Sequence, residues 1–180
     1  MEGYFAMIIA KKRIAAAFII FFVSILLLTA CGESTDSANL NVNPEALGMK
    51  ILEATEFNDN MSEADSDIML NMYGIDEELV EDAFFYTSTG ATAEELAVIV
   101  TKTPNDAVDA DAVNEITKRL QERAEKQRDG FADYVPTELT KLENPAILSQ
   151  RNTAVLLIAD DTKPGMDAFE KYFIELDGEK

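Results

Sequence analysis

Hydrophobic residues recur every three or four positions in several segments of the chain, the spacing that gathers them on one face of an α-helix. The first segment opens with Asn43 and Pro44, an N-cap residue followed by a first-turn proline, and runs to about Phe57. A longer segment opens with Thr103 and Pro104 and is expected to stop at Gly130. The pattern predicts helices over residues 43–57, 62–74, 103–129 and 136–142, and a last helix after Thr162 with Met166, Phe169, Phe173 and Ile174 facing inward.

Four other segments are predicted to be strands, because they alternate or form short apolar runs. Thr92 and Glu95 also form a capping box that favours a helix. We favour a strand there, because residues 96–101 are β-branched and nearly all apolar. The strands are expected at Val80–Thr87, Leu96–Thr101, Ala146–Ser149 and Thr153–Ala159. This order of elements predicts an α+β fold, a two-layer domain in which a small, mostly antiparallel sheet packs against helices.

The first part of the chain has the pattern of a lipoprotein signal peptide. A basic cluster at residues 11–13 precedes an apolar run over residues 14–28, which is short of the ~20 residues that span a bilayer. Met7, just ahead of this cluster, would also serve as a start. We expect cleavage before a lipidated cysteine and recognition of the residues ahead of it, in the lipobox Leu28, Thr29, Ala30 and Cys31.

This pattern predicts the organisation of the whole chain. Residues 1–30 would form the signal peptide, residues 31–42 the lipidated cysteine with a flexible polar tether, and residues 43–180 a single α+β domain. We therefore expect a protein anchored in the membrane by acyl chains on Cys31, on the outer face of a cytoplasmic membrane of the Gram-positive type.

Composition excludes several classes of function. The chain carries 15 basic and 34 acidic residues, a formal net charge of −19, which repels nucleic acids. It has no histidine, and Cys31 is its only cysteine, so catalytic triads and histidine or thiolate metal sites are excluded. We expect no cofactor, no nucleic-acid partner and no enzymatic activity.

Acidic residues that could bind a hard cation or another ligand occur in two places. Asp59 and Asp65 lie in a loop rich in oxygen ligands, and Asp160 with Asp161 follows the last predicted strand. The loop does not match the EF-hand spacing. Helix capping and solvation explain both groups more simply, so we keep these four residues only as candidates for a ligand or cation site and predict no metal site from them.

Basic residues cluster on the long predicted helix and could receive an acidic partner. Glu115 and Glu122 lie four positions before Arg119 and Lys126, the spacing of ordinary ion pairs along a helix. We therefore expect a solvated helix face. The cluster consists of Lys118, Arg119, Arg123, Lys126 and Arg128.

Several short motifs carry a resemblance to a known family. They are Tyr73-Gly74-Ile75-Asp76, the stretch Gly90–Val98, Asp133-Tyr134-Val135-Pro136 and Leu142-Glu143-Asn144. With the final apolar strand, these motifs resemble a family of Gram-positive lipoproteins that is named only as a domain of unknown function, number 4358. The resemblance covers about residues 47–173 and implies a fold and a location, without functional residues.

These observations lead to one expected function and one alternative. We expect a membrane-anchored extracytoplasmic lipoprotein that acts as a non-catalytic binding or protein-interaction module, with a protein partner at the cell surface. The alternative is a lipid-anchored protein that binds a small molecule or calcium.

Overall fold

The computed structural model describes residues 40–178 of the chain. Its centre is a five-stranded antiparallel sheet with the strand order β1-β2-β3-β5-β4. In the central strand β3, Val98 pairs with Phe84 of β2 on one side and with Val155 of β5 on the other. The strands are β1 (Ser62–Glu63), β2 (Val80–Thr87), β3 (Glu95–Thr101), β4 (Ala146–Gln150) and β5 (Thr153–Ile158).

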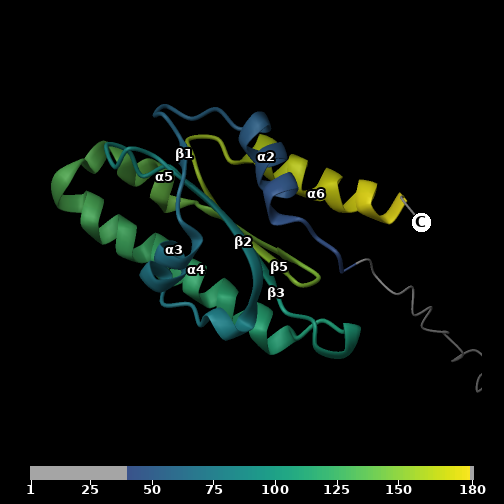
Figure 1. Ribbon diagram of the computed structural model, residues 1–180. Coiled ribbons are helices and arrows are strands. Elements are labelled where there is room, and N and C mark those ends of the chain that lie inside the picture. The colour runs from purple at the N-terminus through teal and green to yellow at the C-terminus, as the bar shows by residue number, and fades with distance from the viewer. Residues whose placement is uncertain (1–39, 179–180) are drawn as a thin grey trace, which may run out of the picture. The chain divides into compact units, whose positions relative to one another are not determined.

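Helices cover both faces of this sheet (Figure 1). One face carries α2 (Pro44–Ala54) and α6 (Lys163–Gly178), and the other carries α3 (Ser66–Tyr73), α4 (Ala110–Tyr134) and α5 (Leu139–Glu143). Short 3-10 turns complete the chain at η1 (Glu77–Leu79), η2 (Pro104–Asp106) and η3 (Pro136–Glu138).

The alternation of side chains along β3 explains this arrangement. Leu96, Val98 and Val100 pack with α2 and α6, whereas Ala97 and Ile99 pack with α3 and α4. Because both faces are buried, the strand reads as a continuous apolar run. The predicted α+β class and antiparallel sheet are confirmed, and helices on the second face add a third layer to the two that we expected.

The long helix α4 differs from its predicted boundaries at both ends. It begins at Ala110, with Asp109 as N-cap, because residues after Thr103 form the turn η2, in which Asn105 has φ 59°. It also continues through Gly130 to Tyr134. Glycine ends a helix readily only where φ is positive, and within a helix it costs only about 1 kcal/mol.

The ends of α3 and the buried face of α6 also differ in part from the prediction. The helix expected from Ser62 begins only at Ser66, because Ser62 lies in β1 and Asp65 is the N-cap of α3, accepting a hydrogen bond from the Ile68 amide at 3.0 Å. Gly74 ends that helix with φ 67°, as predicted. In α6, Ile174 was expected to face inward but is 71% exposed, because the buried stripe runs through Phe169, Tyr172 and Phe173. The two-residue strand β1 had no signal in the sequence.

The predicted signal peptide and the lipobox Leu28, Thr29, Ala30 and Cys31 lie outside the described residues. The described part of the chain begins where we had expected the end of the tether. There Val42 is buried, and the Asn152 side-chain amide donates a hydrogen bond to the carbonyl of Leu40 at 3.2 Å. No helix among residues 40–178 is long and apolar enough to cross a membrane.

Candidate functional site

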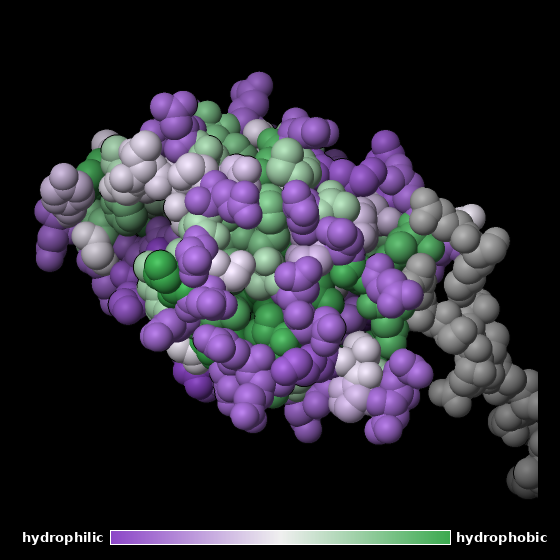
Figure 2. Space-filling model, viewed as in Figure 1, coloured by the Kyte–Doolittle hydropathy of each residue, from purple (hydrophilic) through white to green (hydrophobic). Residues whose placement is uncertain are grey.

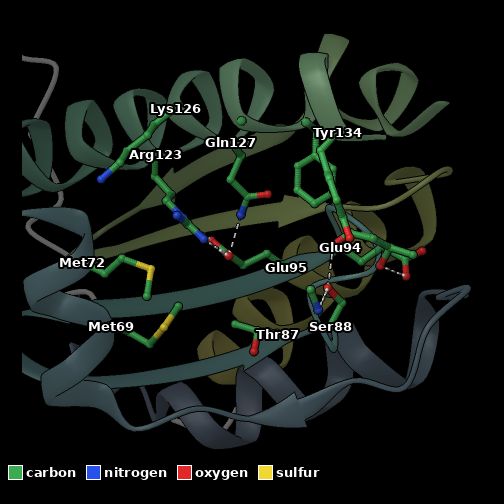
Figure 3. Close-up of a pocket in the computed structure, with 14 residues that line it drawn as sticks. Met69, Met72, Thr87, Ser88, Glu94, Glu95, Arg123, Lys126, Gln127 and Tyr134 are labelled. Atoms are coloured by element: carbon green, nitrogen blue, oxygen red, sulfur yellow. Dashed lines mark hydrogen bonds and ion pairs between the residues drawn. The ribbon is translucent and has the colours of Figure 1, made fainter. Parts of the chain in front are cut away.

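A pocket of about 460 Å³ opens between α3 and α4, above the first residues of β3; we call it the α3–α4 pocket. Its apolar walls come from Met69 and Met72 of α3 and from Phe131 and Tyr134 of α4. Figure 3 shows the two methionines on one side, Tyr134 on the other, and Arg123 and Gln127 reaching from α4 toward Glu95. The remaining lining residues are Thr87, Ser88, Gly90, Thr92, Glu94, Lys126 and Gly130.

Glu95 lies at the floor of this pocket and is 2% exposed. Its carboxylate accepts hydrogen bonds from Arg123 Nε at 3.0 Å and Nη2 at 2.6 Å, from Gln127 Nε2 at 2.6 Å, and from the hydroxyl of Tyr73. The Arg123 guanidinium also lies 5.4 Å from the centre of the Tyr73 ring. A two-point arginine contact and two neutral donors use the capacity of this carboxylate.

The pKa values of Tyr73 and Arg123, the two titratable partners of Glu95, are both raised by their surroundings. Burial, reinforced by the charge of Glu95, raises the pKa of Tyr73 well above its ordinary value, so its hydroxyl remains a neutral donor. Burial alone would lower the pKa of Arg123, but hydrogen bonding and attraction to Glu95 outweigh burial and raise it. The Glu95 cluster therefore joins α3, α4 and β3 through one compensated charge pair.

A second buried carboxylate, Glu94, precedes β3 and faces a different set of partners. Lys141 Nζ lies 3.2 Å from Glu94 and 2.9 Å from Glu138, and only 3% of the Lys141 side chain is exposed. Glu94 also accepts hydrogen bonds from the amides of Asn58 at 2.8 Å and Asp59 at 2.9 Å. This cluster therefore fixes α5 and the loop at residues 58–60 to the start of β3.

Lys141 remains charged inside this cluster. Burial would lower the pKa of its ammonium group, but the hydrogen bonds to Glu138 and Glu94 and their negative charges outweigh it, and the pKa is raised.

The four tentative ligand residues all take part in hydrogen bonds within the protein. Asp65 caps α3, and Asp161 accepts a hydrogen bond from the amide of Lys163, the first residue of α6, at 3.0 Å. Asp160 accepts from the Asn58 side-chain amide, and its carboxylate lies 3.9 Å from Lys141. Among residues 40–178, no group of three or more histidine, cysteine, aspartate or glutamate side chains could hold a metal ion.

Asp59 connects its loop to the β2–β3 hairpin. Its carboxylate accepts hydrogen bonds from the Thr89 amide at 2.9 Å and from the Thr89 hydroxyl at 2.5 Å. The hydrogen bond from the Thr89 hydroxyl is the main cause that lowers the pKa of Asp59 below its ordinary value. The structure thus brings Asp59 and Asp160 to the loop that Glu94 holds, and Asp65 lies elsewhere at the start of α3.

The basic cluster on α4 is divided between surface and interior. Glu115 pairs with Arg119 at 2.7 Å, as predicted. The predicted pair between Glu122 and Lys126 is wrong, because Glu122 pairs instead with Arg119 at 3.0 Å and with Lys118 at 3.5 Å. Arg123 points inward to Glu95.

Sequence analysis missed Glu94, Glu95 and Lys141 as a group. The available signal was two consecutive acids directly before a β-branched apolar run, since a charge beside a buried strand requires a partner. We considered Glu95 only as part of a capping box. The partners of Glu94 and Glu95 named above lie 22 or more positions away along the chain, so the tertiary fold was needed to find them.

Comparisons with known proteins give one match. A sequence model of the family "Domain of unknown function (DUF4358)" matches residues 53–159, which include the strands β1 to β5 and both buried carboxylate clusters. No curated protein and no solved structure is significantly similar to the chain.

Proposed function

Because this chain belongs to the DUF4358 family, which is defined without an activity, we propose a function from the chain's own features. We propose that it is a lipid-anchored extracytoplasmic binding module without catalytic activity, and that the α3–α4 pocket is its binding site. The location and the binding site depend on separate observations.

The lipobox at residues 28–31 supports the location. A basic cluster, a short apolar run and a single cysteine after Ala30 form the pattern that diacylglycerol transfer requires. Two acyl chains on Cys31 suffice for stable anchoring.

The form of the α3–α4 pocket is the observation that carries the binding proposal. Its volume lies within the range of about 300–1,000 Å³ that is usual for small-ligand sites. Exposed apolar side chains surround it, since Met72 is 43% and Tyr134 is 79% exposed. Figure 2 shows hydrophobic surface over α3 among hydrophilic side chains, and exposed apolar surface of this kind marks interaction sites.

A second hollow, of about 770 Å³, is larger but fits a ligand less well. It lies at the other end of β3, beside Val100 and Lys102, and no aromatic side chain lines it. Four carboxylates line it, namely Glu78, Glu81, Asp82 and Asp109. The mutual repulsion of these carboxylates and the absence of an aromatic side chain from the lining make this hollow the poorer ligand site.

The state of the pocket carboxylates supports binding rather than catalysis. A general base needs a free lone pair near the proton that it abstracts. Glu95 is already bonded to Arg123, Gln127 and Tyr73, and Glu94 to Lys141 and two backbone amides.

The binding proposal can be tested with the full chain in lipid nanodiscs. We expect at least one apolar small molecule from a panel to raise the melting temperature. The Gly130→Phe variant should abolish that rise, because its ring would fill the pocket from a position with open space above it. Failure of every compound, or equal shifts in both proteins, would contradict the proposal.

The location requires a separate test. Cells of a Gram-positive host that produce the full chain should incorporate a labelled fatty acid into it, and the Cys31→Ser variant should remain unlabelled. Equal labelling of both proteins, or of neither, would contradict the lipid anchor.

A further inference from the structure

The chemistry of the pocket walls indicates a ligand class, and this inference rests on the proposed binding function. We propose that the α3–α4 pocket binds an N-acylated amino acid or short peptide with a free carboxylate on an apolar last residue. The carboxylate pairs with Lys126, and the apolar side chain packs between Met69, Met72 and Tyr134.

Lys126 supplies the charge complementarity. Within residues 40–178, Lys126 and Arg128 are the basic residues that form no ion pair or hydrogen bond, and of the two only Lys126 lines the pocket. A cation without a partner is notable in a chain with a formal net charge of −19. Glu122, four positions before Lys126, is bonded to Lys118 and Arg119, and Asp129, three positions after it, forms no ion pair with Lys126.

The other charged side chains that line the pocket have ionic partners. Arg123 pairs with Glu95, and Glu94 shares Lys141, behind the pocket, with Glu138. Lys126 is therefore the one charged lining residue without an ionic partner in the described part of the chain, so an anion in the pocket can pair with it.

The apolar walls suit a flat or branched side chain. Met69 is buried and Met72 half exposed, and methionine adapts its shape and makes favourable contacts with aromatic rings. Phe131 and Tyr134 form the facing wall, so an aromatic or large aliphatic group can lie between this wall and the methionines.

Gly130 leaves room for a peptide backbone in this wall. It lies inside α4, its φ is not positive, and an added Cβ would meet no atom within 4 Å. Neither packing nor backbone conformation among the described residues requires glycine there, although it costs the helix about 0.5–1 kcal/mol relative to alanine. A glycine at such a position allows a ligand to approach the helix backbone closely.

The side chain of Gln127 favours a ligand that carries a hydrogen-bond donor. Its Nε2 is bonded to Glu95, but its buried Oε1 has no hydrogen-bond partner within the described chain, and the residue is 8% exposed. Figure 3 shows this oxygen turned away from Glu95, toward Tyr134. An unsatisfied buried acceptor is costly, and the N–H of an acylated amino acid is a donor that could satisfy it.

Methionine-methyl NMR on the full chain in nanodiscs can show where a probe binds and can compare the affinities of two probes. The probes are N-acetyl-phenylalanine and its amide, which differ in the charge of one group. We expect the acid to shift the Met69 and Met72 signals, with Met166 on the opposite sheet face unchanged. We expect the acid to bind about fivefold more tightly than the amide, in the range of a partly exposed ion pair.

Two variants make the test specific. Lys126→Gln should bring the affinities for acid and amide close together, whereas Lys118→Gln, a matched change on an exposed part of α4, should leave the ratio unchanged. Gly130→Phe should suppress both shifts. Equal binding of acid and amide to the unaltered protein would overturn the ligand class but leave the pocket as a binding site. No shift of Met69 or Met72 with either probe would overturn the ligand class alone, provided that a compound in the melting panel binds.

Discussion

The two faces of the sheet are built from the same strands but differ in how tightly they are packed. On the α2–α6 face, a Cβ at Gly48 would lie 2.2 Å from Phe84, and one at Gly165 would lie 2.5 Å from Leu157. On the α3–α4 face, a Cβ at Gly130 would meet nothing within 4 Å. The helices of the first face are in tight contact with the sheet at these two glycines, whereas α4 on the second face is open at Gly130, beside the α3–α4 pocket.

The faces also differ in polarity. The α2–α6 side buries neutral polar residues such as Thr55, whereas the helices of the other side contribute buried ionic contacts, Arg123 of α4 to Glu95 and Lys141 of α5 to Glu94. An apolar core can repack around a changed side chain and still stabilise the fold. A buried charge that loses its partner is strongly destabilising. The ion pairs therefore hold the elements that surround the pocket in fixed positions.

The largest effect is expected from breaking a buried ion cluster. Lys141→Met would leave Glu94 and Glu138 close together without their cation, and we expect the free energy of unfolding to fall by about 3–5 kcal/mol. Urea unfolding followed by circular dichroism measures this change. Lys163→Met, which removes an exposed pair with Asp167, is the matched control and should cost less than about 1 kcal/mol. Similar losses of stability for the two variants would show that the buried cluster contributes no more to the free energy of unfolding than an exposed ion pair.

A single methyl group should be enough to disturb the tightly packed face. Gly48→Ala places a carbon against the Phe84 ring, so helix α2 or the ring must shift, and we expect a loss of about 1–3 kcal/mol. Gly178→Ala, also in a helix but with no atom within 4 Å of the added carbon, is the control and should be nearly neutral. A stable Gly48→Ala protein would mean that this face is less closely packed than described.

The same substitution should have the opposite sign on the open face. Gly130→Ala lowers the conformational entropy of the unfolded chain and meets no steric obstacle, so we expect a gain of about 0.5–1 kcal/mol in the same urea measurement. A loss of stability would contradict the open space above this position.

The sequence predicted the fold better than it predicted the site, for a physical reason. Helical and strand periodicity are local properties, so the existence and type of the major elements and the Gly74 stop could be predicted, although the starts of α3 and α4 lie several residues later than expected. The pairing of Glu94 with Lys141, or of Glu95 with Arg123, depends on which helix covers which end of β3, and no local pattern encodes that. Even the correct helix spacing of Glu122 and Lys126 predicted the wrong pair, since two other cations lie within reach of the same carboxylate.

The smallest expected effect concerns the hairpin beside the pocket and depends on pH. The pKa of Asp59 is lowered in the folded protein. Its contact with Thr89 therefore stabilises the loop at pH values above 3.8, the ordinary pKa of an aspartate. That contribution is lost as the pH falls through the lowered pKa. We therefore expect the hydrogen-exchange protection factor of the Thr89 amide to decrease as the pH falls below 3.8, while amides in β5 keep theirs. Asp59→Asn should remove the pH dependence at Thr89, because an amide side chain does not titrate in this range. If the pH dependence persisted in that variant, another acid would have to control the loop, and Asp59 would be only one of its hydrogen-bond acceptors.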